Sequence, residues 1–382
     1  MPFAALEEKL PVIRAQGTNY QIGYAHGSQG KDRVGITLRN LQQGVKRTVG
    51  QDWAVCVKIA SAFLPVVERR FPAYLEEIKG IADGSGQSFE DIFTLNCRTE
   101  LGQQFSRRPA QNAARALSLA GGCSVVGANH TRTATGTTIY GQNWDADPAQ
   151  RETMVFVVVR QKDKPDIAWA GEAGLICRMA GVNSAGIGLG GNTLFCSAPI
   201  DFEGLPLQFT YRSIMDQSNF PDAVEAAAMS RLASCNNLMV CGPEGEMVNI
   251  ERDYKGYGML YMKDGLIAHA NHYRHPKLPR APYREIDLYP KDELRSFRLE
   301  YLMEQLPEKG ITAQDLMEIL CDHKVNYPAS VCQHLPTCAT NFSTVTDLNR
   351  LEMHIAVGNP CGGYLALRPF EEDGGAGEGE RT

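Results

Sequence analysis

The stretch AGGCSVVGANHTRTATGTTIYGQNWDAD, residues 120–147, sets a cysteine directly after two glycines and in front of a β-rich segment, with Asn-Trp-Asp near its far end. An inert buried cysteine needs neither the glycines nor the acid. The runs CSVVGA and TTIYGQNWD are typical of two strands joined by a hairpin, which would return Asp145 to the side of Cys123. The stretch therefore predicts that a β-rich body begins at Cys123 and that this thiol reacts.

The chain on either side of this stretch differs in its periodicity. Up to about residue 100 the pattern is mostly helical, as in residues 69–84, where apolar residues recur at helical spacing. Residues 101–119 lose this periodicity and indicate an exposed connector. After Cys123, short β-type runs such as TMVFVVVR, LICRMAGV and EMVNIER alternate with Gly, Pro, Asn and Asp.

Helices are also expected within the β-rich part. The predicted helical stretches are 222–232, 292–306 and 312–321. Further strands are expected at 339–346 and 351–367, and the acidic, glycine-rich tail 371–382 is expected to be disordered. A helical front followed by a β-dominated body with helices packed on it predicts an α+β fold.

Composition excludes several classes of function. The 382-residue chain has a net charge of −6 and no basic run, which excludes the electrostatic pattern of a nucleic-acid binder. Eleven cysteines, an odd number spread over a long chain, indicate free thiols in a reducing compartment. No signal-peptide pattern, apolar run of about 18 residues or peroxisomal ending is found, which predicts a cytoplasmic protein without a membrane segment.

The chemistry expected at Cys123 depends on a base for its thiol. No histidine lies close to it in sequence. If the Gly122–Cys123 bond were cut, the new α-amino group, with a reference pKa of about 8, could take the thiol proton. The thiol could make this cut itself through an N-to-S shift, with Gly122 tolerating the strained backbone and Asp145 stabilising the new ammonium. Taken alone, Gly-Gly-Cys also fits a turn before a buried strand cysteine.

Several blocks along the chain, in order, resemble the acyl-coenzyme A:6-aminopenicillanic acid acyltransferase (isopenicillin N acyltransferase) family, the C45 group of N-terminal-nucleophile hydrolases. These blocks are QGTNYQIGYAHGSQGK, FPAYLEEIKGIADG, LNCRTE, GCSVV, GQNWDAD, EAGLICRMAGVNSAGIGL, HANH and NYPASVCQ. The resemblance implies a precursor, or zymogen, cut between Gly122 and Cys123. It implies a helical α chain of residues 1–122 that stays associated with a β chain of residues 123–382, which forms an αββα sandwich of two antiparallel sheets between helical layers.

The same resemblance assigns roles to individual residues. It implies that Cys123 is the nucleophile, that Asp145 is the acid of the Asn-Trp-Asp motif, and that Asn271 in HANH helps to build the oxyanion hole. Ser330 and Asn192 are candidate positioning residues.

The chain also departs from the family pattern. Where the penicillin enzyme has an arginine shortly after the Ser-x-Cys element, this chain has Gln333. Where that enzyme has Asn-Tyr before an asparagine after NSAG, this chain has Gly190 and Gly191 before Asn192. The catalytic centre therefore carries over better than the substrate pocket, and penicillin chemistry does not follow.

Rival interpretations rest on other motifs. His269, His272 and His275 lie three residues apart, the basis for an alternative zinc-dependent hydrolase, although the nearby strand-like GMLYM and Pro276 argue against a helix there. The run GIGLGGN fits a tight strand connection better than a phosphate loop. A non-catalytic binding protein on the same fold is the third alternative, which loss of Cys123 or Asp145 would have signalled.

The spacing of two cysteine pairs decides whether they fit a zinc site. Cys235 and Cys241, like Cys332 and Cys338, have five intervening residues, the wrong spacing for a zinc ribbon, so these residues are expected to be buried cysteines.

The function predicted is that of a self-activated N-terminal cysteine acyltransferase or amidohydrolase. It would form an acyl-enzyme at Cys123 from a small amide or an acyl-coenzyme A thioester and pass the acyl group to water or to an amine. No metal or other cofactor is expected, with coenzyme A entering only as part of an acyl donor. The expected partners are these small molecules and the two cleaved chains, with no nucleic acid and no membrane.

Overall fold

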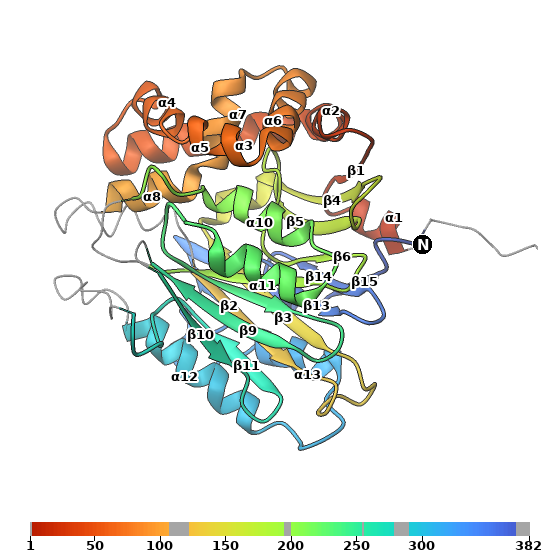
Figure 1. Ribbon diagram of the computed structural model, residues 1–382. Coiled ribbons are helices and arrows are strands. Elements are labelled where there is room, and N and C mark those ends of the chain that lie inside the picture. Colours follow the sequence, from red (N-terminus) through yellow and green to blue (C-terminus); the bar gives the residue numbers. More distant parts are fainter. Residues whose placement is uncertain (1, 107–121, 195–199, 254–255, 279–289, 372–382) are drawn as a thin grey trace, which may run out of the picture.

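The computed structural model describes residues 2–106, 122–194, 200–253, 256–278 and 290–371 (Figure 1). It contains two β-sheets, each built from segments far apart in the sequence. The first sheet has eight strands in the spatial order β1-β4-β5-β6-β7-β8-β9-β10. Their bounds are β1 Val12–Gln16, β4 Met154–Arg160, β5 Ile167–Glu172, β6 Gly181–Asn183, β7 Gly188–Thr193, β8 Asn236–Cys241, β9 Met247–Arg252 and β10 Tyr257–Tyr261. All neighbours are antiparallel except β1, which adds to the edge parallel to β4.

The second sheet has the order β11-β2-β3-β13-β14-β15, with β12 pairing β13. Its strands are β2 Gly122–Ala128, β3 Ile139–Ala146, β11 Leu266–His269, β12 His334–Leu335, β13 Cys338–Asp347, β14 Glu352–Val357 and β15 Leu365–Leu367. The expected hairpin is confirmed, because β2 pairs antiparallel with β3 and sets Gly122 opposite Asp145 and Cys123 opposite Trp144. On its other side Asp145 faces Thr340 of β13.

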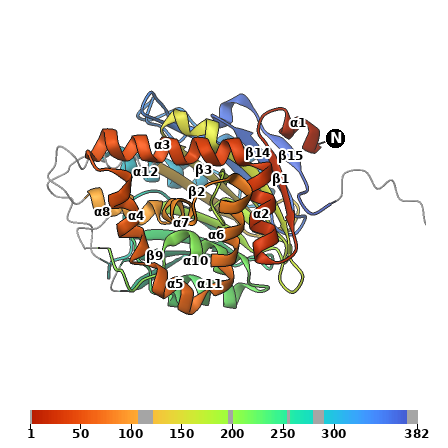
Figure 2. The ribbon, with the colours of Figure 1, turned by 90° about the horizontal axis from the view of Figure 1, so that it is seen from above.

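The helices before Cys123 pack on one another and on the first sheet. They are α1 Pro2–Glu7, α2 Asn19–Gln29, α3 Lys31–Val49, α4 Trp53–Ser61, α5 Leu64–Arg70, α6 Pro72–Ser85, α7 Phe89–Asn96 and α8 Arg98–Ser106. Figure 2, seen from above, shows α3 running across the helical layer, and α4, α6 and α7 contact it. The α2 and α6 backbones touch, because a Cβ added at Gly23 would lie 2.0 Å from the Glu77 carbonyl oxygen and one at Gly80 would lie 2.2 Å from that of Tyr20. Glycines are therefore required at this crossing.

The helices after Cys123 pack on both sheets. They are η1 Pro148–Thr153, α10 Leu207–Met215, α11 Phe220–Met229, α12 Pro290–Glu304, α13 Ala313–Leu320 and η2 Pro360–Gly362. Helices α10 and α11 pack on the eight-stranded sheet, whereas α12 and α13 cover β2, β3, β11 and β13 of the other sheet (Figure 1). With β2 packed on β7 between them, the layers follow the order helix, sheet, sheet, helix. The α+β prediction and its αββα sandwich are confirmed.

Burial in the strands follows from this layering. Six of the seven residues of β4, MVFVVVR, are buried, as are all residues of β5 and β8. A sheet covered on both faces favours continuous apolar strands over alternation. No helix in the described ranges is both long and apolar enough to cross a bilayer.

Some local expectations are wrong. Residues 101–106 belong to α8 and not to a connector, while 107–119 fall outside the described residues. In LICRMAGV only the last residues enter a strand, since left-handed backbone at Gly174 (φ 92°) and Ala180 (φ 66°) interrupts an extended run. The edge strand β1 and the helix α10 were not expected. The expected disorder concerns a tail of which only Glu371 is described.

Candidate active site

Cys123, the second residue of β2, is held by hydrogen bonds on both sides of its backbone. Its N–H donates to Asn271 Oδ1 at 2.8 Å, and its carbonyl accepts from Asn192 Nδ2 at 3.0 Å. The side chain is fully buried, with Sγ 3.9 Å from the sulfur of Met179. The structure thus brings Cys123, Asn192 and Asn271, which are far apart in sequence, into direct contact.

The environment of the Cys123 thiol is both buried and cationic. Burial, with the charge of Asp145 adding to it, raises the pKa of the thiol to about 12. Arg178, Arg295 and a hydrogen bond from the Thr193 backbone act in the opposite direction. In this structure, in which Cys123 is still bonded to Gly122, the thiol is therefore protonated at neutral pH, and groups that would stabilise a thiolate surround it.

Asp145 is buried among three hydrogen-bond donors. Its Oδ2 accepts from Arg295 Nη1 at 2.8 Å and from Gln333 Nε2 at 2.6 Å, and its Oδ1 accepts from Thr340 Oγ1 at 2.7 Å. Burial raises the pKa of this carboxyl, while the charge of Arg295 and the hydrogen bonds from Thr340 and Gln333 lower it. The buried oxygen Gln333 Oε1 has no hydrogen-bond partner among the described atoms, so it remains available as an acceptor beside Asp145.

Arg295 of α12 links Asp145 to the rest of the site. Its Nη2 donates to Asn271 Oδ1 at 2.7 Å and to Asp292 Oδ1 at 2.5 Å, while Nη1 binds Asp145. Because Asn271 Oδ1 also accepts the Cys123 N–H, one amide oxygen joins the guanidinium to the cysteine backbone. Sequence reasoning missed Arg295, which lies 150 residues beyond Asp145.

The space at Gly122 explains why the residue before Cys123 is glycine. A Cβ there would lie 3.0 Å from Arg295 Nη1, 3.1 Å from Gln333 Nε2 and 3.2 Å from Asp145 Oδ2. The expected backbone strain is absent, because Gly122 has no left-handed φ and pairs regularly with Asp145 in the sheet. A side chain here would crowd the polar cluster and require its side chains to shift, which glycine avoids.

The two candidate asparagines are themselves oriented by neighbours. Asn192 Oδ1 accepts from Asn237 Nδ2 at 2.9 Å, and the same Asn237 nitrogen donates to Asn249 Oδ1 at 2.8 Å, which directs the Asn192 NH₂ toward Cys123. Asn271 Nδ2 donates to the Thr193 carbonyl at 2.9 Å. An amide nitrogen carries two hydrogens, so Asn271 Nδ2 has a second N–H besides the one that Thr193 accepts.

A second buried arginine, Arg178, lies in the loop between β5 and β6 and acts on the thiol by its charge. The Arg178 guanidinium lies 5.1 Å from the Trp144 ring centroid, and its Nε is 3.4 Å from Glu172 Oε2. Arg98 of α8 also pairs with Glu172, so the helical front contributes a charge to this network. Sequence reasoning missed both arginines.

Two further predicted features occupy other positions. Ser330 is buried and donates to the Cys332 carbonyl at 2.8 Å, so it braces the loop that carries Gln333. The run GIGLGGN enters β7, which agrees with a strand connection.

In the segment HANHYRH, both ring nitrogens of the first histidine, His269, already have partners. His269 Nε2 is paired with Glu251 Oε1 at 2.8 Å, and its Nδ1 lies 2.6 Å from the Ala270 carbonyl oxygen. His272 stacks on it, with ring centroids 6.2 Å apart. Among the described residues, the His and Cys side chains that lie close enough together to bind one metal ion are His323, Cys332, His334 and Cys361.

Comparison with known proteins identifies the family. The model of the acyl-coenzyme A:6-aminopenicillanic acid acyl-transferase family matches residues 131–361, well over half of the chain. The chain belongs to this acyltransferase family. The acyl-coenzyme A:6-aminopenicillanic-acid-acyltransferase 40 kDa form of Emericella nidulans is 26% identical over 337 residues, which cover 88% of each chain. The matched region includes Asp145, Asn271 and Gln333 and begins after Cys123.

Solved structures with a similar arrangement are more distant. The Caenorhabditis elegans N-acylethanolamine-hydrolyzing acid amidase ortholog has a TM-score of 0.46 at 17% identity, covering 59% of this chain and 93% of that one. A variant of the conjugated bile acid hydrolase from Clostridium perfringens has a TM-score of 0.41 at 12% identity, covering 61% of this chain and 89% of that one.

Proposed function

We propose that this chain is the precursor of an N-terminal cysteine acyltransferase or amidohydrolase that cuts itself between Gly122 and Cys123. The observation that carries the proposal is the position of the Cys123 backbone N–H, which donates to Asn271 Oδ1 while Arg295 joins that oxygen to Asp145. An amino group released at this point would lie against the Asn271 amide oxygen, which can accept from an ammonium, and Arg295 would link that oxygen to Asp145.

The cut itself uses the Cys123 thiol. Its sulfur attacks the Gly122 carbonyl carbon, the S–C bond forms, the C–N bond breaks, and the thiol proton ends on the departing α-amine. Water then hydrolyses the thioester, which gives a carboxylate at Gly122 and restores the thiol. Gly122 suits this step because its lack of a side chain leaves the carbonyl unhindered beside Arg295.

The mature enzyme would use the new α-amino group as its base. This amine takes the proton of Sγ as the sulfur attacks an acyl donor, and gives it to the leaving group. The free N–H of Asn271 and backbone amides stabilise the oxyanion, while Asn192 holds the Cys123 carbonyl. Water or an amine then takes the acyl group from sulfur.

Contacts across the proposed cut support continued association of residues 1–122 with residues 123–382. Strand β1 is hydrogen-bonded to β4. Arg212 of α10 is fully buried and binds Glu77 of α6 at 2.9 Å, and Tyr74 donates to Asp216 at 2.8 Å. Separating the fragments would expose these paired charges and an edge strand, which is unfavourable.

The substrate class follows from the family. The Emericella relative is named for acyl-coenzyme A and 6-aminopenicillanic acid. We extend to this chain only the shared chemistry, a small-molecule acyl donor that is an amide or an acyl-coenzyme A thioester, with an amine or water as acceptor. The replacement of an arginine by Gln333 places a neutral amide beside Asp145, so the acceptor need not be the one used by that relative.

The test is intact mass and N-terminal sequencing of the purified protein beside Cys123→Ala. We expect two fragments, one of which begins at Cys123, and an uncut chain in the variant. Cys97→Ser, at a buried cysteine of the helical front, is the matched control and should still be cut. A wild-type chain that stays whole after long incubation would refute the proposal; a cut chain justifies assays with acyl-thioesters and N-acyl amines.

A further inference from the structure

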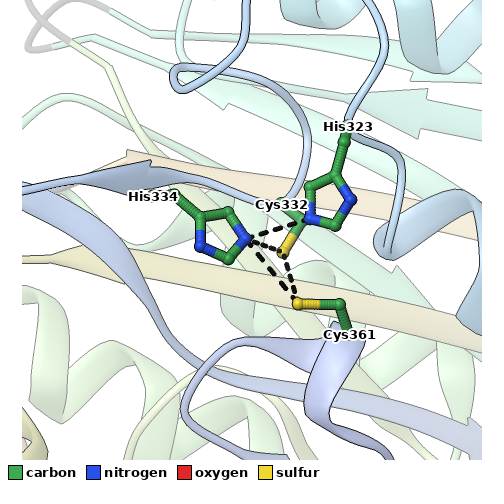
Figure 3. Close-up of side chains that lie close together, drawn as sticks. All are labelled: His323, Cys332, His334 and Cys361. Atoms are coloured by element: carbon green, nitrogen blue, oxygen red, sulfur yellow. Dashed lines mark hydrogen bonds between the residues drawn. The ribbon is translucent and has the colours of Figure 1, made fainter.

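Two histidines and two cysteines converge in a cluster, and two of them, Cys332 and His334, flank Gln333 in the sequence (Figure 3). His334 Nε2 lies 3.0 Å from His323 Nε2, 3.3 Å from Cys332 Sγ and 3.7 Å from Cys361 Sγ. The two sulfurs are 3.9 Å apart, and all four ligand atoms lie within 4.8 Å of one another. The residues come from the loop after α13, from β12 and the residues just before it, and from η2.

These distances can be compared with those of a tetrahedral zinc centre. Zn–S bonds of about 2.3 Å and Zn–N bonds of about 2.0 Å, at the tetrahedral angle, separate two sulfurs by about 3.8 Å, sulfur from nitrogen by about 3.5 Å and two nitrogens by about 3.3 Å. The observed separations are 3.9 Å between sulfurs, 3.3 and 3.7 Å between sulfur and the His334 nitrogen, and 3.0 Å between nitrogens. Four of the six ligand-atom separations are thus close to those of the coordination shell, and the two from His323 to the sulfurs are within 4.8 Å.

We propose that His323, Cys332, His334 and Cys361 bind one zinc ion. Two thiolates and two neutral imidazoles form a ligand set that suits zinc in kind and number, and the two thiolate charges balance the ion. Binding releases one proton from each thiol as its Zn–S bond forms. His323 and Cys361 are exposed, which gives the ion a path from solvent.

The surroundings of the sulfurs fit a metal-bound thiolate. Asn359 Nδ2 lies 3.6 Å from Cys332 Sγ, and Arg151 Nη2 donates to Asn359 Oδ1 at 2.7 Å, so the amide N–H is turned toward the sulfur. Donors around a ligand atom commonly orient it in metal sites. A disulfide between Cys332 and Cys361 explains less, because it needs sulfurs about 2.05 Å apart and leaves both histidines unexplained.

The ion would be structural, since the protein supplies all four ligands. The ion would affect the candidate active site through Gln333. This residue lies between the ligands Cys332 and His334 in the sequence and donates to Asp145 at 2.6 Å. The same residue's carbonyl accepts from Asn359 Nδ2 at 2.6 Å. Zinc would therefore fix the loop that presents Gln333 to the candidate active site.

The first experiment measures zinc in the reduced, full-length protein, purified without metal-affinity resin, by plasma mass spectrometry. We expect about one zinc per chain. Cys361→Ser and His323→Ala, at the two exposed ligands, should each lower retained zinc at least about fivefold. Cys321→Ser and His354→Ala are matched controls, nearby but outside the cluster, and should retain it. Cys123→Ala should also retain it, which separates the site from the candidate nucleophile.

A second measurement does not depend on how the variants fold. The zinc of the wild-type protein is removed with a chelator and replaced by Co²⁺. Four-coordinate binding predicts the intense visible bands of tetrahedral cobalt and a near-ultraviolet thiolate-to-cobalt band, both saturating at one ion per chain. Reduced protein without bound zinc and with only the weak spectrum of six-coordinate cobalt would overturn the proposal. So would full zinc retention in both ligand variants, or a native Cys332–Cys361 disulfide found by peptide mapping.

Discussion

Replacement of Arg295 by methionine tests whether this guanidinium organises the site. The side chain is 1% exposed and binds Asp145, Asn271 and Asp292. Methionine keeps much of the length and removes the charge, so Asp145 retains only its neutral donors Gln333 and Thr340. A buried carboxylate that has lost its cation is strongly unfavourable.

The expected loss in free energy of unfolding is about 3–5 kcal/mol, the usual range for breaking one side of a buried ion pair. Asp145→Asn alone should cost less, and the double variant should be more stable than the sum of the two losses by about 1–3 kcal/mol, because the orphaned charge is gone. Arg298→Met is the matched control on the same helix. Arg298 binds Asp322 at 2.7 Å with its side chain 12% exposed, against 1% for Arg295, so a smaller loss is expected.

The assay is urea unfolding, followed by tryptophan fluorescence and circular dichroism, with every variant in the Cys123→Ala background so that the chain stays whole. In the presence of Cys123, Arg295→Met should also slow cleavage at Gly122 at least about tenfold, whereas Arg298→Met should leave it unchanged. Two results would refute the reasoning: losses for Arg295→Met and Asp145→Asn that add within about 0.5 kcal/mol, or an Arg298→Met loss as large as that of Arg295→Met.

Three other changes have defined outcomes. Gly122→Ala should slow cleavage by roughly 5- to 100-fold in a gel time course, because its Cβ would crowd Arg295 Nη1 at 3.0 Å; an unchanged rate contradicts this. In the cut enzyme, kcat/KM should rise with pH through about 8 as the Cys123 α-amino group loses its proton, and a flat profile from pH 6 to 9 would exclude that base. Burial lowers the pKa of His26, which accepts from the Gly174 N–H, to about 4. The protein should therefore lose about 3 kcal/mol of its free energy of unfolding as pH falls from about 6.5 to 4. In urea titrations His26→Gln should flatten this pH dependence, and a wild-type slope in the variant would contradict the assignment.

The hairpin was predictable from sequence because both of its strands and its acid lie within one short stretch. Short β-type runs separated by turn residues predict β2 and β3, and their register then brings Asp145 opposite Gly122. Most of the larger strands and α11–α13 were also predictable from periodicity. The strand β1 was not, since it has only five residues and lies inside an otherwise helical segment.

The arginines of the site could not be predicted because long-range packing places them. Arg295 follows Asp292 on α12 as one charged residue among several, and only the docking of that helix on β2 and β11 turns it inward to Asp145. Arg178 lies in a stretch whose strand assignment was wrong. A local pattern carries no signal for such residues.

The metal cluster shows a different limit. In the sequence, the cysteine nearest to Cys332 is Cys338, and the five residues between them do not fit the spacing of a zinc ribbon. In the structure Cys332 faces Cys361 and two histidines, one of them eleven residues from the other, so the ligands come from three segments and match no short motif. Only the antiparallel return of β13 and β14 brings η2 back to the loop before β12.

Burial at Cys123 also decides the order of events in the proposed mechanism. In the uncut chain burial raises the pKa of the thiol to about 12, so it is protonated at neutral pH. The nitrogen of Cys123 is then a peptide amide, which cannot accept the thiol proton when an external donor binds. The cut turns that nitrogen into an amine whose reference pKa is about 8. The amine appears where the peptide N–H already met Asn271 Oδ1 at 2.8 Å, so no rearrangement of the asparagine is required. Acyl transfer from an external donor should therefore be absent before cleavage and should rise in proportion to the cut fraction.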